Sequence, residues 1–459
     1  MKGERVSGAS EHAAQYFARY AEPEAALAAS IPDAYCAALV VPVRAEEPSL
    51  LSGFQAALEH APGRVLFILV VNATESESSS ALAANQRLLA HLEATFPERR
   101  VLGVPEVKTR ATLAHGSNYD LLWLDCTSAG VRLPERTGVG TVRKLGGDLA
   151  AALWARGQIA CPRIASSDAD VTLPIDYFAT LAQDIAEPKR SSAWLWPFHH
   201  ATGGDPEIDA ATVLYEISLR YYVLGLAAAG SPYAYQSVGS TLCVDAPAYL
   251  SVRGFPKREA GEDFYLLDKL SKVGPLRRIE ATSLAIRSRV SDRVPFGTGR
   301  RSREIAEQTG AGDPFVLYSP RIFEVLGAVL SGLDEFAQST RVEDLERALV
   351  LRVPDWAEPA RAVLDGLGVF EALSSAAKGA PRGPVLRRRI HTWFDALRTL
   401  RFVHGLRDRG LPSIPWRDAL GSASFLREPF RDGSEPDAVR RALSRAEAEL
   451  PKQIGPALL

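Results

Sequence analysis

Apolar runs of strand length alternate with longer segments of helical spacing along the N-terminal part of the chain. The runs of strand length cover residues 35–43, 64–71, 119–125 and 159–166. Apolar positions recur at helical spacing in residues 49–60, 79–96, 141–155 and 264–271. Strands that alternate with helices of this length predict βαβ units, which build a mainly parallel sheet flanked by helices.

The pattern changes on both sides of this α/β region. Residues 1–32 are polar and alanine-rich, which predicts a helical extension that ends at Pro32. After residue 304 the strand signals fade, and helical spacing dominates in residues 342–351, 358–373 and 386–406. We therefore expect an N-terminal extension over 1–32, an α/β domain over 33–303 and a helical region over 304–459.

Composition narrows the class of protein. Of the 459 residues, 46% are hydrophobic and 24% are charged, as in ordinary globular proteins. The 53 basic and 55 acidic residues leave a formal net charge of only -2. With so little net charge we expect no binding to nucleic acid, and anions must be bound by local groups.

The spacing of the cysteines and the hydropathy of the chain predict the cellular compartment of the protein. Cys36, Cys126, Cys161 and Cys243 are far apart and lack the spacing of a zinc site or a disulfide framework, which predicts free thiols in a reducing compartment. Residues 1–20 carry charges and lack the apolar core of a secretory signal. The most apolar stretch, 210–230, is interrupted by Glu216 and Arg220, which we expect on the wet side of an amphipathic helix. A cytoplasmic protein without a transmembrane segment is predicted.

The first candidate site is the acidic triplet 168–170. Asp168 and Asp170 follow the strand predicted over 159–166, and residues two apart in an extended chain point to the same side. Two carboxylates there suit Mg²⁺ or Mn²⁺, which in turn bridges a diphosphate. The alternative is a turn or helix cap, because Asp favours those positions and Pro174 follows. The triplet alone does not decide between them.

The second candidate site is the pair Glu262 and Asp263, which opens the helix predicted from residue 264. Acidic side chains in a first helical turn are stabilised by the helix dipole, which is the structural alternative to a catalytic role. The breaker at residues 254–256 lies just upstream. It places the pair at a junction between loop and helix, where catalytic bases often lie.

Taken in order, several segments resemble family 2 glycosyltransferases, which have the GT-A fold. The matching segments are VVPVRAEEPSL (40–50), LFILVVNATE (66–75), GVGTVRKLGGDLA (138–150), ASSDADVTLP (165–174) and STLCVDAPAYLSVRGFPKREAGEDFYLLDKL (240–270). The resemblance covers about residues 35–301 and implies a Rossmann-like, nucleotide-binding sheet for this part of the chain.

The resemblance also implies roles for individual residues. The donor nucleotide, linked as a UDP- or GDP-sugar, is expected against the segments that contain Pro42, Arg44, Glu46 and Asn72. Arg143 and Lys144 are expected near the diphosphate, and Asp168 and Asp170 are expected to bind the metal ion. Asp263 is the expected base and Glu262 its support. A single carboxylate base on the acceptor side predicts an inverting transfer to an acceptor that we do not identify.

Two departures from the family pattern concern the donor. Many relatives have an acidic residue after the second strand where this chain has Asn72, which leaves the nucleotide base open. Relatives often add a late histidine to the metal, whereas residues 286–300 offer Arg287, Arg289 and Arg293. These arginines either bind the leaving diphosphate or form a basic surface loop, and the sequence favours neither.

Other interpretations stay open. Trp194, Trp196, His199 and His200 are a candidate acceptor patch, although burial is the better expectation for the tryptophans. A sugar-phosphate nucleotidylyltransferase also uses a nucleotide-binding sheet and a metal, but residues 41–49 lack the glycine-rich phosphate loop it needs. A non-catalytic binding protein with the same fold is a third possibility, against which the two acidic clusters speak.

Overall fold

A computed structural model describes residues 13–183, 191–290, 297–378, 382–427, 430 and 433–459. The chain divides into two compact units. The first unit comprises Met1–Thr202, Ser237–Leu270 and Leu276–Arg300, and the second comprises Gly203–Gln236, Ser271–Pro275 and Arg301–Leu459. The second unit therefore takes in two segments, 203–236 and 271–275, that precede the predicted boundary at residue 303, together with the C-terminal part of the chain.

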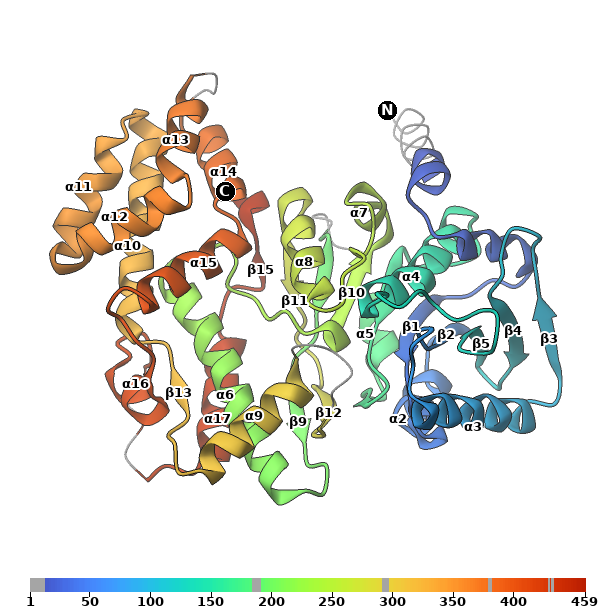
Figure 1. The fold of residues 1–459 in the computed structure, drawn as a ribbon. Coiled ribbons are helices and arrows are strands. Elements are labelled where there is room, and N and C mark those ends of the chain that lie inside the picture. The colour runs from blue at the N-terminus through green and yellow to red at the C-terminus, as the bar shows by residue number, and fades with distance from the viewer. Residues whose placement is uncertain (1–12, 184–190, 291–296, 379–381, 428–429, 431–432) are drawn as a thin grey trace. The chain divides into compact units, whose positions relative to one another are not determined.

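The first unit is built on one large sheet (Figure 1). Its strands are β1 (Ala37–Val43), β2 (Val65–Asn72), β3 (Arg99–Leu102), β4 (Arg110–His115), β5 (Tyr119–Cys126), β6 (Arg163–Ser166), β8 (Ala193–Leu195), β10 (Leu242–Asp245) and β11 (Leu276–Arg278). They lie in the order β11-β8-β10-β6-β1-β2-β5-β4-β3. The centre, β6-β1-β2-β5, is parallel, whereas β10 and β4 pair antiparallel with both of their neighbours. The predicted α/β class with a parallel sheet centre is confirmed.

Helices cover both faces of the parallel centre, because its strands are apolar on both sides. Every residue of β2 is buried. On one face α4 (Val139–Ala155) packs so closely that a β-carbon on Gly146 would lie 2.4–3.3 Å from side-chain carbons of Val40 and Val70. On the other face the ring of Phe54 in α2 (Ser52–Glu59) lies 5.0 Å from that of Phe67. Helix α3 (Ser79–Thr95) lies on the same side as α2 (Figure 1).

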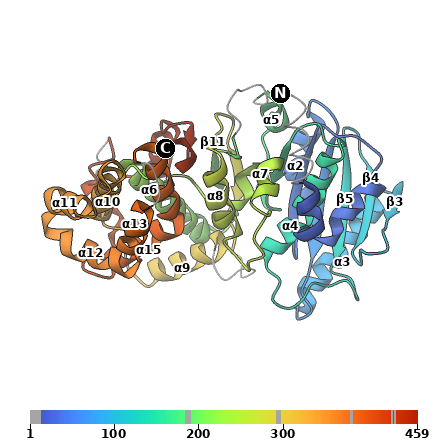
Figure 2. The same cartoon turned by 90° about the horizontal axis from the view of Figure 1, so that it is seen from above.

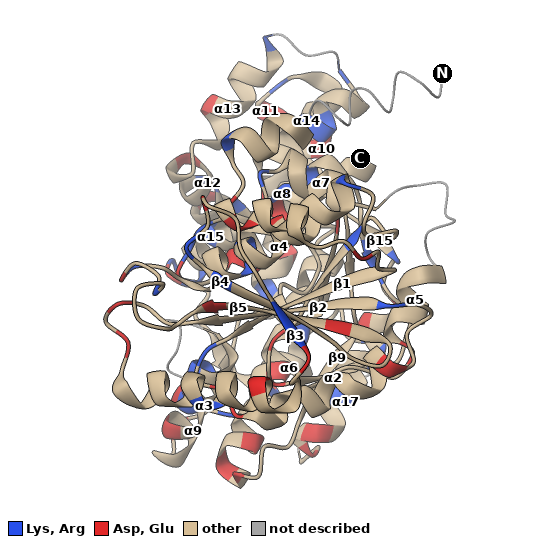
Figure 3. Cartoon of the chain, turned by 90° about the vertical axis from the view of Figure 1, so that its right-hand side faces the viewer, with Lys and Arg blue, Asp and Glu red and all other residues tan. Residues whose placement is uncertain are grey.

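Several elements of the first unit were not predicted. The antiparallel extension β4-β3 is one, and the charged β3 is its outermost strand (Figure 3). A second, smaller sheet has the order β7 (Val171–Thr172), β12 (Leu284–Arg287) and β9 (Phe198–Ala201). The strands of these two additions are short or largely polar, so periodicity does not reveal them.

The N-terminal extension, which was predicted to be helical, contains the 3-10 helix η1 (Pro23–Ser30), which packs against α4.

The second unit is mainly helical (Figure 2), and its helix α10 (Pro320–Ser339), which is buried along one face, packs against α6, α11, α14 and α15. The others are α6 (Pro206–Ala228), α9 (Thr298–Gly310), α11 (Glu343–Arg352), α12 (Ala357–Gly366), α13 (Val369–Ala377), α14 (Pro384–Trp393), α15 (Ala396–Arg407), α16 (Trp416–Ser422) and α17 (Pro436–Ala448). The stretch 358–373 is divided at Gly368, which has a left-handed φ of 72°. The stretch 386–406 is divided at Asp395, whose side chain caps α15.

One expectation about this unit is wrong. Glu216 and Arg220 were expected on the wet side of their helix, yet they are 1% and 3% exposed. Arg220 pairs with Glu216 at 2.7 Å and with Glu447 of α17 at 2.8 Å. The charges are stable there because each guanidinium edge meets a carboxylate, which replaces the lost hydration. The interruption of apolar residues marks a buried ion pair between α6 and α17.

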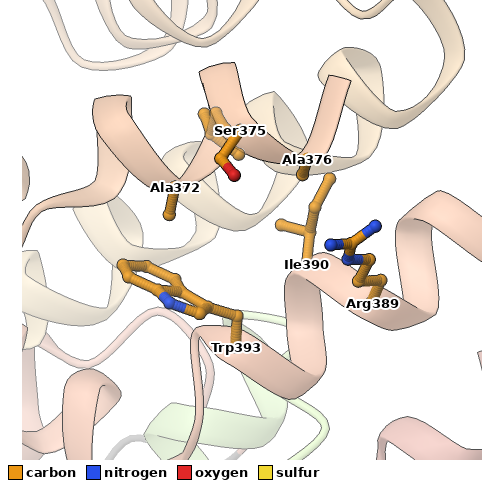
Figure 4. A pocket seen from close by; sticks show the side chains of 7 residues that line it. Ala372, Ser375, Ala376, Arg389, Ile390 and Trp393 are labelled. Atoms are coloured by element: carbon orange, nitrogen blue, oxygen red, sulfur yellow. The ribbon is translucent and has the colours of Figure 1, made fainter. Parts of the chain in front are cut away.

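A small pocket of about 140 Å³ lies between α13 and α14 in the second unit (Figure 4). Its walls are the side chains of Ala372, Leu373, Ser375, Ala376, Arg389, Ile390 and Trp393. None of these walls carries a carboxylate or an imidazole. The pocket therefore offers no acid or base for catalysis.

Two further expectations concern the thiols and the membrane. Cys126, Cys161 and Cys243 are buried and Cys36 is partly buried, and all four are free thiols, as predicted. Among the described residues, no helix combines the length and the apolar character that a bilayer crossing requires.

Candidate functional site

The two acidic motifs meet at the carboxyl ends of the parallel strands. Asp168 and Asp170 follow β6, and Glu46 follows β1. Glu262 and Asp263 open α8 (Glu262–Val273), which begins directly after Gly261 with its left-handed φ of 69°. This edge is where ligands bind in open α/β sheets, because loops from neighbouring strands converge there.

Arg143 of α4 joins the two motifs. Its Nε donates to Glu262 Oε1 at 2.8 Å, and its Nη2 donates to Asp168 Oδ1 at 2.6 Å. Its Nη1 donates to Ser166 Oγ at 2.8 Å and to the Ser167 carbonyl at 3.1 Å. Arg143 is only 3% exposed, so these partners fix its guanidinium. We call Arg143, Asp168, Glu262 and Asp263 the Arg143 cluster.

Glycines bring α4 close enough for this contact. A β-carbon on Gly138 or Gly140 would collide with the backbone of residues 256–259, which lead into α8. The N–H of Gly140 donates to the Arg258 carbonyl at 3.1 Å. Gly239 lies against the cluster itself, since a β-carbon there would be 2.6 Å from Arg143 Nη2 and 3.3 Å from Asp263 Oδ2. The glycines of 138–147 thus serve close packing of the helix.

Asp263 is the carboxyl group of the cluster that Arg143 does not bind directly. Its Oδ1 accepts the Phe264 N–H at 2.7 Å. Burial, followed by the charge of Glu262, raises the pKa of Asp263 to about 7. Glu262 is held by Arg143 instead. The neighbouring acids therefore differ in character, one fixed in an ion pair and the other poised to exchange a proton near neutral pH.

Arg289, after β12, connects the end of β1 with the turn that holds Asp168 and Asp170, which we call the acidic turn. Its Nε donates to Asp170 Oδ2 at 2.7 Å, and its Nη1 and Nη2 donate to the two oxygens of Glu46 at 2.9 and 2.8 Å. Burial raises the pKa of Asp170, and although Arg289 opposes this, the charges of Asp168 and Glu46 add to it. The Asp170 carboxyl group therefore holds a proton more readily than an exposed aspartate does.

This donor set fits a divalent cation. Within the described part of the chain, Asp168 Oδ2 and Asp170 Oδ1 accept no hydrogen bond, and the two side chains are 35% and 18% exposed. Each carboxylate thus keeps one oxygen for a cation. Five carboxyl groups, of Asp168, Asp170, Glu46, Glu262 and Asp263, face the two guanidinium groups of Arg143 and Arg289. The described residues form no cluster of three or more metal-ligating side chains, so remaining ligands must come from water or substrate, as is usual for Mg²⁺.

Other residues expected at the donor have structural contacts. Arg44 pairs with Glu77 at 2.7 Å, and Pro42 lies within β1 opposite Val70. The buried Asn72 amide donates to the carbonyls of Val43 and Val70 at 2.8 and 3.2 Å. These groups hold the ends of β1 and β2 together, beside the acidic turn.

Asn85 of α3 was missed by the sequence interpretation. Its fully buried side chain accepts the Ala45 N–H at 2.8 Å and donates to the Asn72 carbonyl at 2.9 Å and to Thr127 at 3.0 Å. Ala45 has a left-handed φ of 53°, which is uncommon for a residue with a side chain. Asn85 therefore fixes the loop that carries Glu46. A polar residue on the apolar face of the helix over 79–96 was the available signal.

Lys144 does not join the Arg143 cluster. Its Nζ donates to Asp148 at 2.9 Å and to Tyr16 at 2.7 Å. Asp148 also accepts the hydroxyls of Tyr16 and Tyr249, at 2.5 and 2.7 Å. We call Lys144, Asp148, Tyr16 and Tyr249 the Lys144 cluster. It anchors the N-terminal segment on α4.

The remaining candidates are spread over neighbouring strands. Trp194 and Trp196 are 4% and 3% exposed, as expected from composition. His199 and His200 lie on β9, the first half-buried and the second buried. Arg287 is exposed at the end of β12, and Arg293 lies outside the described residues.

Comparisons with known proteins add little beyond this geometry. No protein-family model and no curated protein matches the chain. Among solved structures it is similar to the mannosyltransferase PcManGT from Pyrobaculum calidifontis in complex with GDP-Man and Mn²⁺. The identity is 14%, the match covers 86% of this chain and 96% of that chain, and the TM-score is 0.33. A likeness this distant carries no argument about the reaction.

Proposed function

We propose that the protein is a metal-assisted glycosyltransferase of the family 2-like GT-A type, which transfers a sugar from a UDP- or GDP-linked donor to an acceptor hydroxyl. One observation carries this proposal. Arg143 ties the acidic turn after β6 to the acidic start of α8, although Asp168 and Glu262, which it joins, are 94 positions apart in the chain. One guanidinium thereby holds Asp168, which we propose as a metal ligand, and Glu262, the neighbour of the proposed base Asp263.

The reaction forms one bond and breaks one bond. The acceptor oxygen attacks the anomeric carbon while the bond from that carbon to the diphosphate oxygen breaks, through a cation-like sugar. Asp263 takes the hydroxyl proton, and its raised pKa suits this role near neutral pH. Glu262, held by Arg143, keeps the start of α8 in place. Attack opposite the leaving group inverts the anomeric configuration.

The departing nucleoside diphosphate accumulates negative charge at the acidic turn. Asp168 and Asp170 are the residues that would hold Mg²⁺ or Mn²⁺ there, through the oxygens that Arg143 and Arg289 leave available. The ion would neutralise the leaving group without a proton transfer. Arg289 adds a guanidinium, whose planar N–H groups match phosphate oxygens.

A panel of nucleotide sugars tests the proposal. Release of nucleoside diphosphate is measured for UDP- and GDP-linked donors with Mg²⁺, Mn²⁺ or EDTA, together with the anomeric configuration of the product. We expect release from at least one donor and a loss of donor affinity in EDTA. Release of pyrophosphate from a nucleoside triphosphate and a sugar phosphate would instead identify a nucleotidylyltransferase. Donor binding without any turnover would identify a binding protein.

A further inference from the structure

Arg289 lies where two acidic side chains converge, and it uses both edges of its guanidinium. One edge binds both oxygens of Glu46, and Nε binds Asp170. Glu46 is 8% exposed, and the Arg289 side chain is 27% exposed. Burial strengthens these pairs, because little water competes for the charges.

A cation at Asp170 would lie close to this guanidinium. Two like charges repel each other more strongly near a protein surface than in water, and a divalent ion doubles the repulsion that a monovalent ion would meet. Arg289 also occupies one of the two Asp170 oxygens. Without another anion present, the site therefore already contains a positive charge that opposes entry of the metal.

A nucleoside diphosphate changes this balance. Its oxygens offer the guanidinium a bidentate partner and offer a metal ion the ligands that the protein lacks. We propose that Arg289 is an internal cation that excludes a divalent ion from Asp170 until a diphosphate engages its guanidinium. Metal and nucleotide then enter the site together, and each raises the affinity for the other. This inference rests on the proposed function, because it takes the nucleoside diphosphate as the ligand.

Manganese binding to the folded, full-length protein tests the inference without any turnover. Free Mn²⁺ is measured by electron paramagnetic resonance, with protein alone and with protein plus GDP or UDP. In the wild type, nucleotide should raise Mn²⁺ affinity by about tenfold or more, within the usual range of coupling between two sites. Arg289→Met should bind Mn²⁺ alone about tenfold more tightly than the wild type. Arg289→Lys keeps the charge and should resemble the wild type.

Arg99→Met is the control, since Arg99 lies on the edge strand β3 and pairs with Glu93. It removes one positive charge and should leave Mn²⁺ binding unchanged. Arg289→Gln repeats the test with a side chain that keeps hydrogen-bonding groups, in case the methionine variant does not fold. Equal Mn²⁺ affinity of the wild type and the neutral variants without nucleotide overturns the inference, as does an absence of Mn²⁺ binding under all conditions. The proposed function fails differently, by an absence of nucleoside diphosphate release from every donor.

Discussion

Arg143 and Lys144 are consecutive residues of α4, and both are buried in ion pairs, yet the two clusters differ in their charge balance. In the Lys144 cluster one ammonium group faces the single carboxylate of Asp148, which also accepts two tyrosine hydroxyls and the Glu22 N–H. In the Arg143 cluster one guanidinium faces three carboxyl groups. Neighbours on a helix point about 100° apart, so one step along α4 separates the two environments.

This difference is the reason why we assign the proposed function to the Arg143 cluster and a structural role to the Lys144 cluster. The Lys144 cluster is neutral, and Asp148 is completely buried. The Arg143 cluster has a surplus of negative charge, and its Asp168 side chain is 35% exposed. Burial together with that surplus raises the pKa of Asp263. Surplus charge that solvent can reach is available to a ligand, whereas a satisfied pair stabilises the fold.

The largest expected effect is on turnover. Asp263→Asn should lower kcat by about 10² to 10⁴, because the carboxamide cannot accept the acceptor proton. Initial rates of nucleoside diphosphate release, with the donor affinity measured by calorimetry, check this. Glu262→Gln is the matched variant and should cost less, because it weakens a support and leaves the base in place. A wild-type rate for Asp263→Asn would assign Asp263 to helix capping.

The Lys144 cluster should respond in stability instead. Lys144→Met leaves the Asp148 carboxylate buried without its counter-charge, which should lower the free energy of unfolding by about 3–5 kcal/mol. Urea unfolding followed by circular dichroism measures the loss. Below the unfolding transition the variant should keep the wild-type kcat. A fall in kcat with unchanged stability would place Lys144 at the donor and remove the distinction between the clusters.

A smaller effect on kcat should follow a substitution at Gly239, which lies against the Arg143 guanidinium. Gly239→Ala places a methyl group 2.6 Å from Arg143 Nη2, so the guanidinium must shift. We expect kcat to fall by about 10- to 10²-fold, the usual cost of displacing a reacting group by about 1 Å. Gly421→Ala is the control, because the added methyl group would have no atom within 4 Å. Gly157→Ala is unsuitable as a control because the positive φ of Gly157 would strain an alanine. Equal rates for Gly239→Ala and Gly421→Ala would show that Arg143 tolerates the shift.

The smallest expected effect is a gradual change of kcat/KM with pH. Because the base acts when deprotonated, kcat/KM should fall about tenfold for each pH unit below the Asp263 pKa of about 7.

The same raised pKa makes stability change with pH in the opposite direction: kcat/KM rises with pH, whereas the free energy of unfolding falls. The folded state binds the Asp263 proton more tightly than the unfolded state, so this contribution to stability is lost as pH rises through about 7. Asp263→Asn should abolish this pH dependence in any residual rate. It should also gain stability relative to the wild type as pH rises from about 4 to about 7. A wild-type pH dependence of the rate in the variant would assign the titration to another group.

The parallel centre of the sheet was predictable from sequence because it is buried on both faces. A run such as β2, in which every residue is buried, reads as continuously apolar. The edge strand β3 was not predictable, since three of its four residues are exposed. The burial of Glu216 and Arg220 was missed for a related reason, because their partner Glu447 lies far away in the chain.

Candidate site residues were found by type, but their contacts were not. The acidic motifs attract attention because carboxylates at a strand end or a helix start suit metal or proton chemistry. Their connection through Arg143 depends on the glycines that bring α4 against residues 256–259, which is a property of packing. Sequence also gave no reason to separate Arg143 from Lys144. The Glu46–Arg289–Asp170 bridge joins segments that only the fold brings together.

The antiparallel extension at β5-β4-β3 determines which strand forms this edge of the sheet. A sheet edge exposes unpaired backbone groups that recruit strands of other molecules, which leads to aggregation. Here the parallel strands are shielded on that side by two more, and the outermost, β3, has only four residues, of which Arg99 and Arg100 are charged (Figure 3). A short strand with charged residues disfavours pairing with a strand of a second copy.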